Sequence, residues 1–270
     1  MKIKELVTAI EHAVAPKRIQ ESYDNCGLIV GNPENDITNI LTTLDINLKV
    51  VEEAIEKQCN VIVAHHPIIF RGLKTLLSTN NNEKIIMFAI QNNISIYAAH
   101  TSLDNVFLTG LNKSIADKLG LQNLTPLKMV DNDTTYSLGA GAVGVLPKKE
   151  YVIDFIYSIQ KKLEISGPIN FSKGFNSSLI DTIAICTGTA SFMASQAKKM
   201  HAHMLITADI TYHTFFDEKD IILVDIGHYE SEKHAGQVIS DNLKKCCHSN
   251  VNVFVSNVNT NPVSSIIKND

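Results

Sequence analysis

Short apolar runs alternate with amphipathic stretches along most of the chain. Residues 61–64 form a continuous apolar run, which is typical of a strand buried on both faces of a sheet. Upstream of this run, Asn47 precedes a stretch in which Val51, Ala54 and Ile55 recur at helical spacing, and an Asn at that position commonly caps a helix. Repeated alternation of such strands and helices predicts an α/β protein whose sheets are mixed and largely parallel.

The same patterns place the other elements along the sequence. An apolar stripe near the N-terminus predicts a helix rather than a signal peptide, and Gly120 is suited to end a helix that begins near Thr109. We expect further helices over residues 83–92, 149–163, 191–200 and 230–245, and strands over residues 40–45, 94–99, 138–145, 181–186, 204–207, 221–224 and 251–255.

A weak internal repeat is visible in the order of these elements. Strand–helix–strand order occupies residues 40–64 and recurs over residues 181–207. Each copy continues to one more strand and then to a histidine four residues before an acid. These pairs are His100 with Asp104 and His228 with Glu232. The repeat predicts two similar α/β domains that contribute to one site.

The boundary between the two domains is expected in a polar, irregular stretch, residues 121–135. This stretch contains Pro126 and the run from Asp131 to Asp133, a composition typical of connections. We expect the first domain to comprise residues 1–126 and 228–270, because the C-terminal helix and strand return to it, and the second to comprise residues 127–227.

Composition and charge narrow the function classes. The 270 residues are 44% hydrophobic and 19% charged, which excludes global disorder, and the net charge of −4 gives no basic field to attract nucleic acid. No apolar run approaches the ~20 residues of a membrane helix, so no membrane role is expected. The five cysteines show no Cys-x-x-Cys spacing, which argues against a disulfide framework and favours a reducing, cytoplasmic location.

The strongest local signal is the pair His65-His66 directly after the buried strand at residues 61–64. Ligands of open α/β sheets bind beyond the carboxyl ends of the strands, and adjacent residues at a strand end diverge. The two imidazoles could therefore serve two different metal ions. Taken alone, a His-His pair is more often a structural or solvated loop feature.

The two histidine–acid pairs strengthen the metal interpretation. His228 and Glu232, four residues apart on an expected helix, would lie on one face, and imidazole with carboxylate suits zinc, iron or manganese. An ordinary surface pair has the same spacing. Asp104 can supply a carboxylate ligand, whereas His100 could be a ligand, a proton shuttle, a group that orients ligands, or a loop histidine.

Asp45 and Asp209 each end a strand, one in each copy of the repeat. Carboxylates at such positions often orient histidine ligands, and they equally often cap the next helix.

Two other patterns are interpreted as having no role in binding. The glycines at 139, 141 and 144 match a dinucleotide fingerprint by spacing, but no helix follows immediately, so we interpret them as a bulged strand. The cluster Cys246-Cys247-His248 lacks further ligands at metal spacing.

Five ordered motifs resemble those of a known family. They are Tyr23-Asp24-Asn25-Cys26-Gly27-Leu28-Ile29-Val30-Gly31, the stretch from Val61 to Pro67, Ala98-Ala99-His100-Thr101-Ser102-Leu103-Asp104, Thr207-Ala208-Asp209-Ile210 with Tyr212-His213, and Asp225-Ile226-Gly227-His228-Tyr229-Glu230-Ser231-Glu232. Together they resemble the NGG-one-interacting-factor-three-like family, whose members are labelled GTP cyclohydrolase 1 type 2 homolog or dinuclear metal centre hexameric protein. The resemblance covers nearly the whole chain.

This resemblance implies two α/β domains with a dinuclear metal site in the cleft between them, and a toroidal homohexamer. By motif, it implies five metal ligands for two divalent ions: His65, His66, Asp104, His228 and Glu232, with Glu232 as the bridge. His66 with Asp104 would serve one ion and His65 with His228 the other. The candidate acid/base is His100, and the candidates for orienting the ligands are Asp45, Asp209 and His213.

The family label implies a metal-dependent hydrolase that opens the imidazole ring of GTP or acts on a related nucleotide-like substrate. Two divalent ions could activate water for such a reaction. The alternative is a non-catalytic metal-binding scaffold or a regulatory or interaction protein. Because five protein ligands leave coordination positions open on two ions, hydrolysis is the favoured interpretation.

Overall fold

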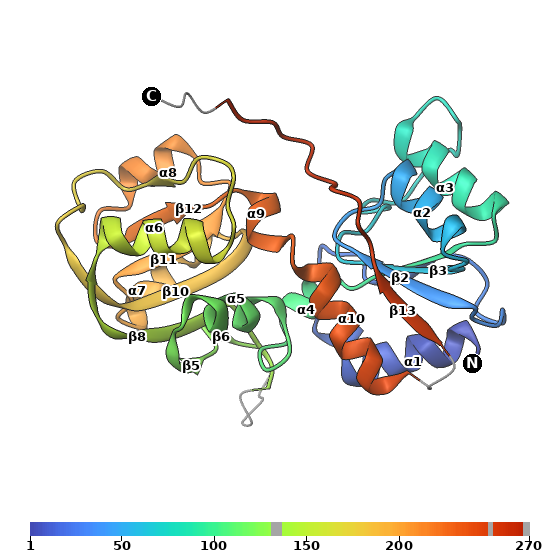
Figure 1. The fold of residues 1–270 in the computed structure, drawn as a ribbon, viewed down its shortest axis with the longest axis horizontal. Coiled ribbons are helices and arrows are strands. Elements are labelled where there is room, and N and C mark those ends of the chain that lie inside the picture. The colour runs from blue at the N-terminus through green and yellow to red at the C-terminus, as the bar shows by residue number, and fades with distance from the viewer. Residues whose placement is uncertain (131–136, 248–250, 267–270) are drawn as a thin grey trace. The chain divides into compact units, whose positions relative to one another are not determined.

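The structure, a computed structural model, describes residues 1–130, 137–247 and 251–266. The chain forms two compact units (Figure 1). The first unit comprises Met1–Asn105 and His234–Thr260, and the second comprises Val106–Lys233 and Asn261–Asp270. The expected α/β architecture is present in both units.

The first unit is built on a five-stranded sheet in the order β1-β4-β3-β2-β13. The four strands from β4 to β13 are parallel to their neighbours, and β1 is antiparallel to β4. The strands are β1 (Gly27–Val30), β2 (Asn39–Thr43), β3 (Val61–Ala64), β4 (Ser95–Ala98) and β13 (Asn252–Val255). This sheet has the largely parallel character that the sequence predicts.

Helices cover both faces of this sheet (Figure 1). The helices α1 (Ile3–Ala13) and α10 (Ala235–Cys246) pack on one face, and α2 (Leu48–Glu56) and α3 (Asn81–Gln91) pack on the other. In β3, Val61 and Val63 face the first pair of helices while Ile62 faces the second. Burial on both faces explains why β3 is a continuous apolar run. The short elements η1 (Lys17–Ile19) and α4 (Thr101–Asp104) complete this unit.

The second unit is built on a six-stranded sheet in the order β5-β8-β10-β11-β12-β9. Only the pairs β10–β11 and β11–β12 are parallel, whereas the remaining pairs are antiparallel. This sheet is therefore mixed rather than largely parallel, because antiparallel strands flank its three parallel central strands. Its strands are β5 (Gln122–Thr125), β8 (Ala142–Tyr151), β9 (Asn170–Phe171), β10 (Leu179–Thr189), β11 (Met204–Ala208) and β12 (Ile222–Asp225).

Two helices of the second unit pack against each other, α5 (Leu111–Leu119) and α6 (Val152–Lys162). The helix α5 also packs on β8 and β10, and α6 packs on β8. The remaining elements are η2 (Ser191–Met193), α7 (Ala194–Lys199), α8 (Tyr212–Asp217), α9 (His228–Glu232) and the two-stranded sheet of β6 (Lys128–Met129) and β7 (Gly139–Ala140).

The bounds of the units differ from the domain bounds expected from the sequence. The first unit ends at Asn105 rather than near residue 126, because α5 packs within the second unit. The helix expected over residues 230–245 is two helices, α9 in the second unit and α10 in the first. The expected return of the C-terminal helix and strand to the first domain is present in α10 and β13. The run Asp131 to Asp133 lies outside the described residues.

Of the glycines at 139, 141 and 144, the first and last lie in strands, and Gly141 lies between the two strands with a positive φ of +66°. Gly139 is in β7 and Gly144 is in β8. A Cβ atom on Gly144 would lie 2.5 Å from Leu124 Cδ2, so this glycine allows close packing rather than phosphate binding. All five cysteines are free thiols. Among the described residues, no helix has the length and apolar character needed to cross a bilayer.

Candidate metal centre

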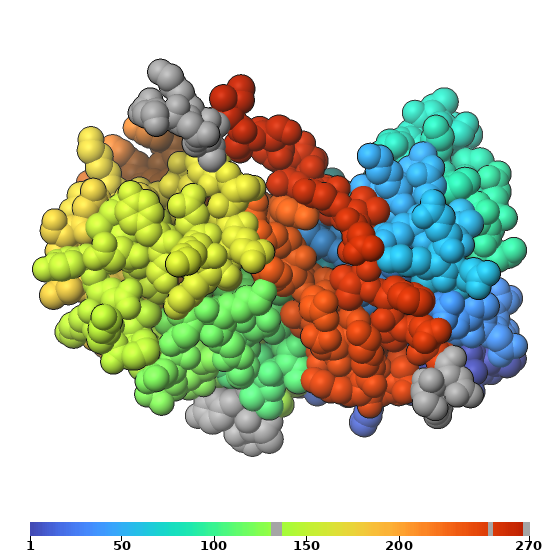
Figure 2. All heavy atoms as spheres, in the orientation of Figure 1, coloured from blue at the N-terminus to red at the C-terminus, as the bar shows by residue number. Residues whose placement is uncertain are grey.

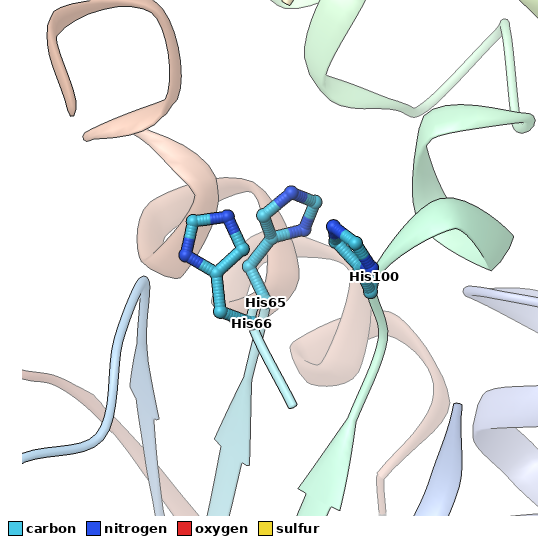
Figure 3. Close-up of side chains that lie close together, drawn as sticks. All are labelled: His65, His66 and His100. Atoms are coloured by element: carbon cyan, nitrogen blue, oxygen red, sulfur yellow. The ribbon is translucent and has the colours of Figure 1, made fainter. Parts of the chain in front are cut away.

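Three histidines of the first unit lie together beyond the carboxyl ends of β3 and β4 (Figure 3). His65 and His66 extend β3, because their N–H groups donate to the carbonyls of Thr43, the last residue of β2, and of Leu44, which follows it. His100 follows β4 and is the N-cap residue of α4. This sheet edge is where open α/β folds bind ligands, as the sequence analysis expected.

The three imidazoles form a compact cluster. The ring centroids are separated by 5.0 Å for His65 and His66, by 5.3 Å for His65 and His100, and by 5.4 Å for His66 and His100. One ring nitrogen from each lies within 4.8 Å of those of the other two. Asp104, at the end of α4, adds a carboxylate, since its Oδ1 atom lies 3.7 Å from His65 Nε2. His65 is fully buried, whereas His66 and His100 are partly exposed.

Asp45 orients His66. Its Oδ1 atom lies 2.7 Å from His66 Nδ1, and its Oδ2 atom accepts a hydrogen bond of 2.7 Å from the hydroxyl of Thr260. Asp45 follows β2, so the sequence expectation that a strand-end carboxylate orients a histidine holds in this geometry. The stretch Thr260-Asn261-Pro262 also fits the family motifs, but Thr260 lies 215 positions from Asp45, so no local pattern connects these two residues.

Asp24 orients His100 in the same way. Its Oδ1 atom lies 2.9 Å from His100 Nδ1, and its Oδ2 atom accepts hydrogen bonds from the backbone N–H and the hydroxyl of Thr101. The Thr101 hydroxyl also accepts the N–H of Glu21, which directs its own proton toward Asp24. Burial alone would raise the pKa of Asp24, but these hydrogen bonds outweigh it and hold the pKa well below its usual range.

The second unit contains a similar arrangement around His228. This residue begins α9, and its Nδ1 atom lies 2.6 Å from Asp209 Oδ2, where the chain leaves β11. The Asp209 oxygen also accepts the hydroxyl of Thr189 at 2.5 Å. On the other side of the ring, His228 Nε2 lies 3.0 Å from Glu232 Oε2. The predicted pair thus shares one face of α9, and Asp209 orients it.

Glu232 is enclosed by the backbone of β10. Its side chain is only 4% exposed, and a Cβ atom on Gly188 would lie 2.4 Å from Glu232 Oε1. Gly188 also has a φ of +66°, a left-handed value that favours glycine. The glycine therefore makes the room in which this carboxylate sits.

Electrostatics in the second unit follow from these contacts. The hydrogen bond to Glu232 is the largest cause that raises the pKa of His228 to about 9, against the opposing effect of burial. Burial would raise the pKa of Asp209, but its hydrogen bonds with Thr189 and His228 lower it below the usual value. At neutral pH, His228 is an imidazolium between two carboxylates, a place where a cation is stabilised.

The donor set fits a divalent metal ion. An aspartate on Nδ1 favours the Nδ1–H tautomer of His66 and His100, and of His228 once its Nε2 proton is lost, so that Nε2 can bind a metal. Imidazole and carboxylate without thiolate suit zinc, iron or manganese. His213, the remaining candidate for orienting ligands, lies exposed on α8, where its ring contacts Tyr212. The role of His213 stays a prediction. Of the cluster that the sequence analysis set aside, Cys246 and Cys247 lie at the end of α10, and His248 lies outside the described residues.

Fold and side chains together define an α/β protein with a histidine–carboxylate site suited to divalent cations at its sheet edges. The match to a family model is more specific. The chain belongs to the Duf34/NIF3 (NGG1p interacting factor 3) family, whose model matches residues 1–262. The family resemblance stated from the sequence motifs is thereby confirmed.

Relatives of known name and structure agree with this assignment. A Clostridium perfringens protein named "GTP cyclohydrolase 1 type 2 homolog" is 33% identical over 98% of this chain and all of its own length. The crystal structure of Staphylococcus aureus protein SA1388 is 31% identical, with a TM-score of 0.88 over 98% of this chain and 99% of that one. A Bacillus cereus protein related to NIF3 has a TM-score of 0.90 at 22% identity over the same shares, which supports the fold.

Proposed function

We propose that this protein is a metal-dependent hydrolase that acts on a nucleotide-like substrate through two divalent ions. The residues that would hold the ions are His65, His66 and Asp104 of the first unit and His228 and Glu232 of the second. When bound, such ions act as Lewis acids and supply a nucleophile from water near neutral pH.

The observation that carries this proposal is the repeated threonine–aspartate–histidine arrangement. In both units a threonine hydroxyl donates to an aspartate that in turn holds a histidine Nδ1. Ligating histidines in metalloproteins are held by carboxylates in this way, and the second hydrogen bond fixes the carboxylate itself. His203 has the same partners in Asp181 and Thr182, but it lies at the opposite end of β11 from Asp209. The arrangement therefore supports a metal site only where further histidines or carboxylates lie beside it, as in the histidine cluster of the first unit.

The protein's own groups would position and protonate the substrate. His100 lies beside His65 and His66, is partly exposed, and is hydrogen-bonded to Asp24, so its Nε2 atom can exchange a proton with a bound group. Asp24 stays ionised and holds the ring in one orientation. The name of the curated relatives points to GTP as a substrate to test first.

The experiment is a turnover screen. Protein loaded with zinc, iron(II) or manganese is incubated with GTP and a panel of other nucleotides, and formate and phosphate release are measured. We expect formate or phosphate release with at least one metal and loss of turnover in His66→Ala. A control variant is His203→Ala, because His203 also pairs with an aspartate, at 3.2 Å, but precedes β11, at the opposite end of that strand from Asp209.

A silent screen with fully metal-loaded protein would contradict the hydrolase and favour the metal-binding scaffold. The homohexamer implied by the family resemblance is a separate proposal. Light scattering of the purified protein tests it through the molar mass, with a value near six chains expected and the mass of a single chain contradicting it.

A further inference from the structure

Two exposed aromatic rings lie beside the histidine cluster of the first unit. Tyr23 is 61% exposed and Phe70 is 43% exposed, and their ring centroids are 6.4 Å apart. The Phe70 ring in turn lies 6.2 Å from the ring of His100, at an interplanar angle of 77°. Since Tyr23 and Phe70 come from segments 47 positions apart in the sequence, the fold brings them together at this place. We refer to the two rings as the aromatic pair.

Hydrogen bonds connect the two segments that carry the aromatic pair to each other and to His100. Asn25, two residues after Tyr23, donates its side-chain amide to the carbonyl of Ile69 at 2.6 Å, directly before Phe70. Asp24, between Tyr23 and Asn25, binds His100. The backbone beside each ring is therefore tied either to the other segment or to His100. Aromatic side chains fixed and exposed beside a polar site are typical of ligand contacts rather than of a core.

The segment that contains Phe70 is also positively charged. Residues 67–80 include Arg71 and Lys74 and contain no Asp or Glu, although the whole chain is acidic. This segment leads into α3 and lies at the outer surface of its unit (Figure 2). Two cationic residues on the segment that carries Phe70 match a ligand that combines a planar ring with negative charge.

We propose that the aromatic pair stacks on the planar heteroaromatic ring of an anionic, nucleotide-like substrate and so holds it against His100. This proposal rests on the proposed function, because it assigns the substrate-binding residues of the same site. Phe70 and Tyr23 are then specificity residues. They recognise the ring, and the segment with Arg71 and Lys74 favours its phosphate groups.

The test uses metal-loaded full-length protein and the 5′-triphosphate of 2-aminopurine riboside, whose fluorescence is quenched when the base stacks on an aromatic ring. We expect quenching and saturable binding with the unaltered protein. Phe70→Leu should weaken binding roughly tenfold and remove most of the quenching, because one stacking partner is lost. Phe70→Trp should restore both, and tripolyphosphate, which has no ring, should bind equally well to all variants.

Leu77→Ala is the matched control, because Leu77 is 55% exposed on the same segment and offers no aromatic face. Its binding should equal that of the unaltered protein. Metal content, measured in parallel, should be the same in every variant. Binding without quenching, or equal affinity of Phe70→Leu and the unaltered protein, would overturn the proposal.

A second outcome that would overturn it is a change of molar mass in Phe70→Leu with no change in nucleotide affinity, since the aromatic pair would then be a contact between copies. Failure of the proposed function is distinguishable. If the protein takes up no metal but still quenches the probe through Phe70, the aromatic pair stands and the metal-dependent hydrolase does not.

Discussion

Single side chains hold three histidines in fixed orientations. His66, His100 and His228 are each held at Nδ1 by an aspartate, and each aspartate is held by a threonine. A flexible imidazole loses rotamer freedom when it binds a metal, so an imidazole already fixed binds more tightly. The threonines should therefore affect metal affinity although they cannot reach the metal.

Replacing Thr260 tests this indirect effect. Thr260→Val removes the hydrogen bond to Asp45 at nearly constant volume, and we expect metal affinity to fall about tenfold, at the low end for residues that support ligands. Thr260→Ser keeps the hydroxyl and should keep the affinity. Competition with a chelating dye measures both. Equal affinity of the valine and serine variants would show that this hydroxyl does not act on the site.

Gly188 provides a steric test of Glu232. In Gly188→Ala, the new methyl group would collide with Glu232 Oε1 at 2.4 Å, so we expect a displaced carboxylate and weaker metal binding. The matched control is Gly174→Ala, because Gly174 also has a positive φ, +98°, but no atom within 4 Å of the new methyl group. Both variants should lose about 1 kcal/mol of unfolding free energy from backbone strain.

Urea unfolding and chelator competition separate the two effects. Only Gly188→Ala should lose metal affinity, because only there does the methyl group meet a ligand. If both variants bound metal as well as the unaltered protein does, the position of Glu232 would not matter to the site.

The role of His100 can be separated from that of the ligands. If His100 transfers a proton, His100→Gln should retain the metal but lose about 10²- to 10⁴-fold in turnover. Elemental analysis and kinetics on the same preparation give both quantities. Loss of metal from His100→Gln would instead make His100 a ligand, a role that its place in the histidine cluster also permits.

Among helices and strands, those with a strong pattern were predictable from the sequence. β3 was predicted at its observed bounds because burial on both faces makes it apolar throughout, and the Asn47 cap of α2 is present, with its side chain accepting the N–H of Val50. β1 was not predicted, because it is an edge strand of only four residues whose two middle residues are partly exposed. The break between α9 and α10 was also missed, since residues 230–234 contain no Gly or Pro to mark it.

The site was predictable only in part, for a related reason. The histidines and their acids follow the ends of strands, and so do Asp45 and Asp209. Their positions after predicted strands made them recognisable as candidates. Asp24, Thr260 and the aromatic pair lie in loops with no periodicity, and their partners are distant in sequence. Such contacts depend on how the loops fold back, which local patterns do not determine.

Metal binding at His228, the first residue of α9, should release a proton. Because the pKa of His228 is raised to about 9, chiefly by Glu232, the metal-free protein is protonated there at neutral pH. A metal on Nε2 must displace that proton. Affinity should therefore rise with pH, by up to about tenfold per unit from this residue, and the rise should end as pH passes 9.

Titration calorimetry in buffers of different ionisation enthalpy measures the released proton directly. In Gln or Asn variants of His228, the number of protons released at pH 7 should fall by about one. Proton release that is unchanged in these variants would contradict the assignment of His228 as a ligand.

For the chain as a whole, the same arrangement of a histidine with its supporting acids occurs once in each unit. Each places a histidine after a parallel strand and an acid four residues later, and each orients that histidine with an aspartate from another loop. Such duplication is expected if the two units supply ligands to a common pair of ions. The paired design is therefore best tested through the metal itself.

The most direct measurement is the metal content of the purified, metal-reconstituted protein by elemental analysis. We expect about two transition-metal ions per chain, the number that a two-metal hydrolase requires. In the double variant His65→Ala with His66→Ala, both should be lost, while His203→Ala should keep them. A double variant with unchanged metal content, or an unaltered protein that binds none, would contradict the metal centre.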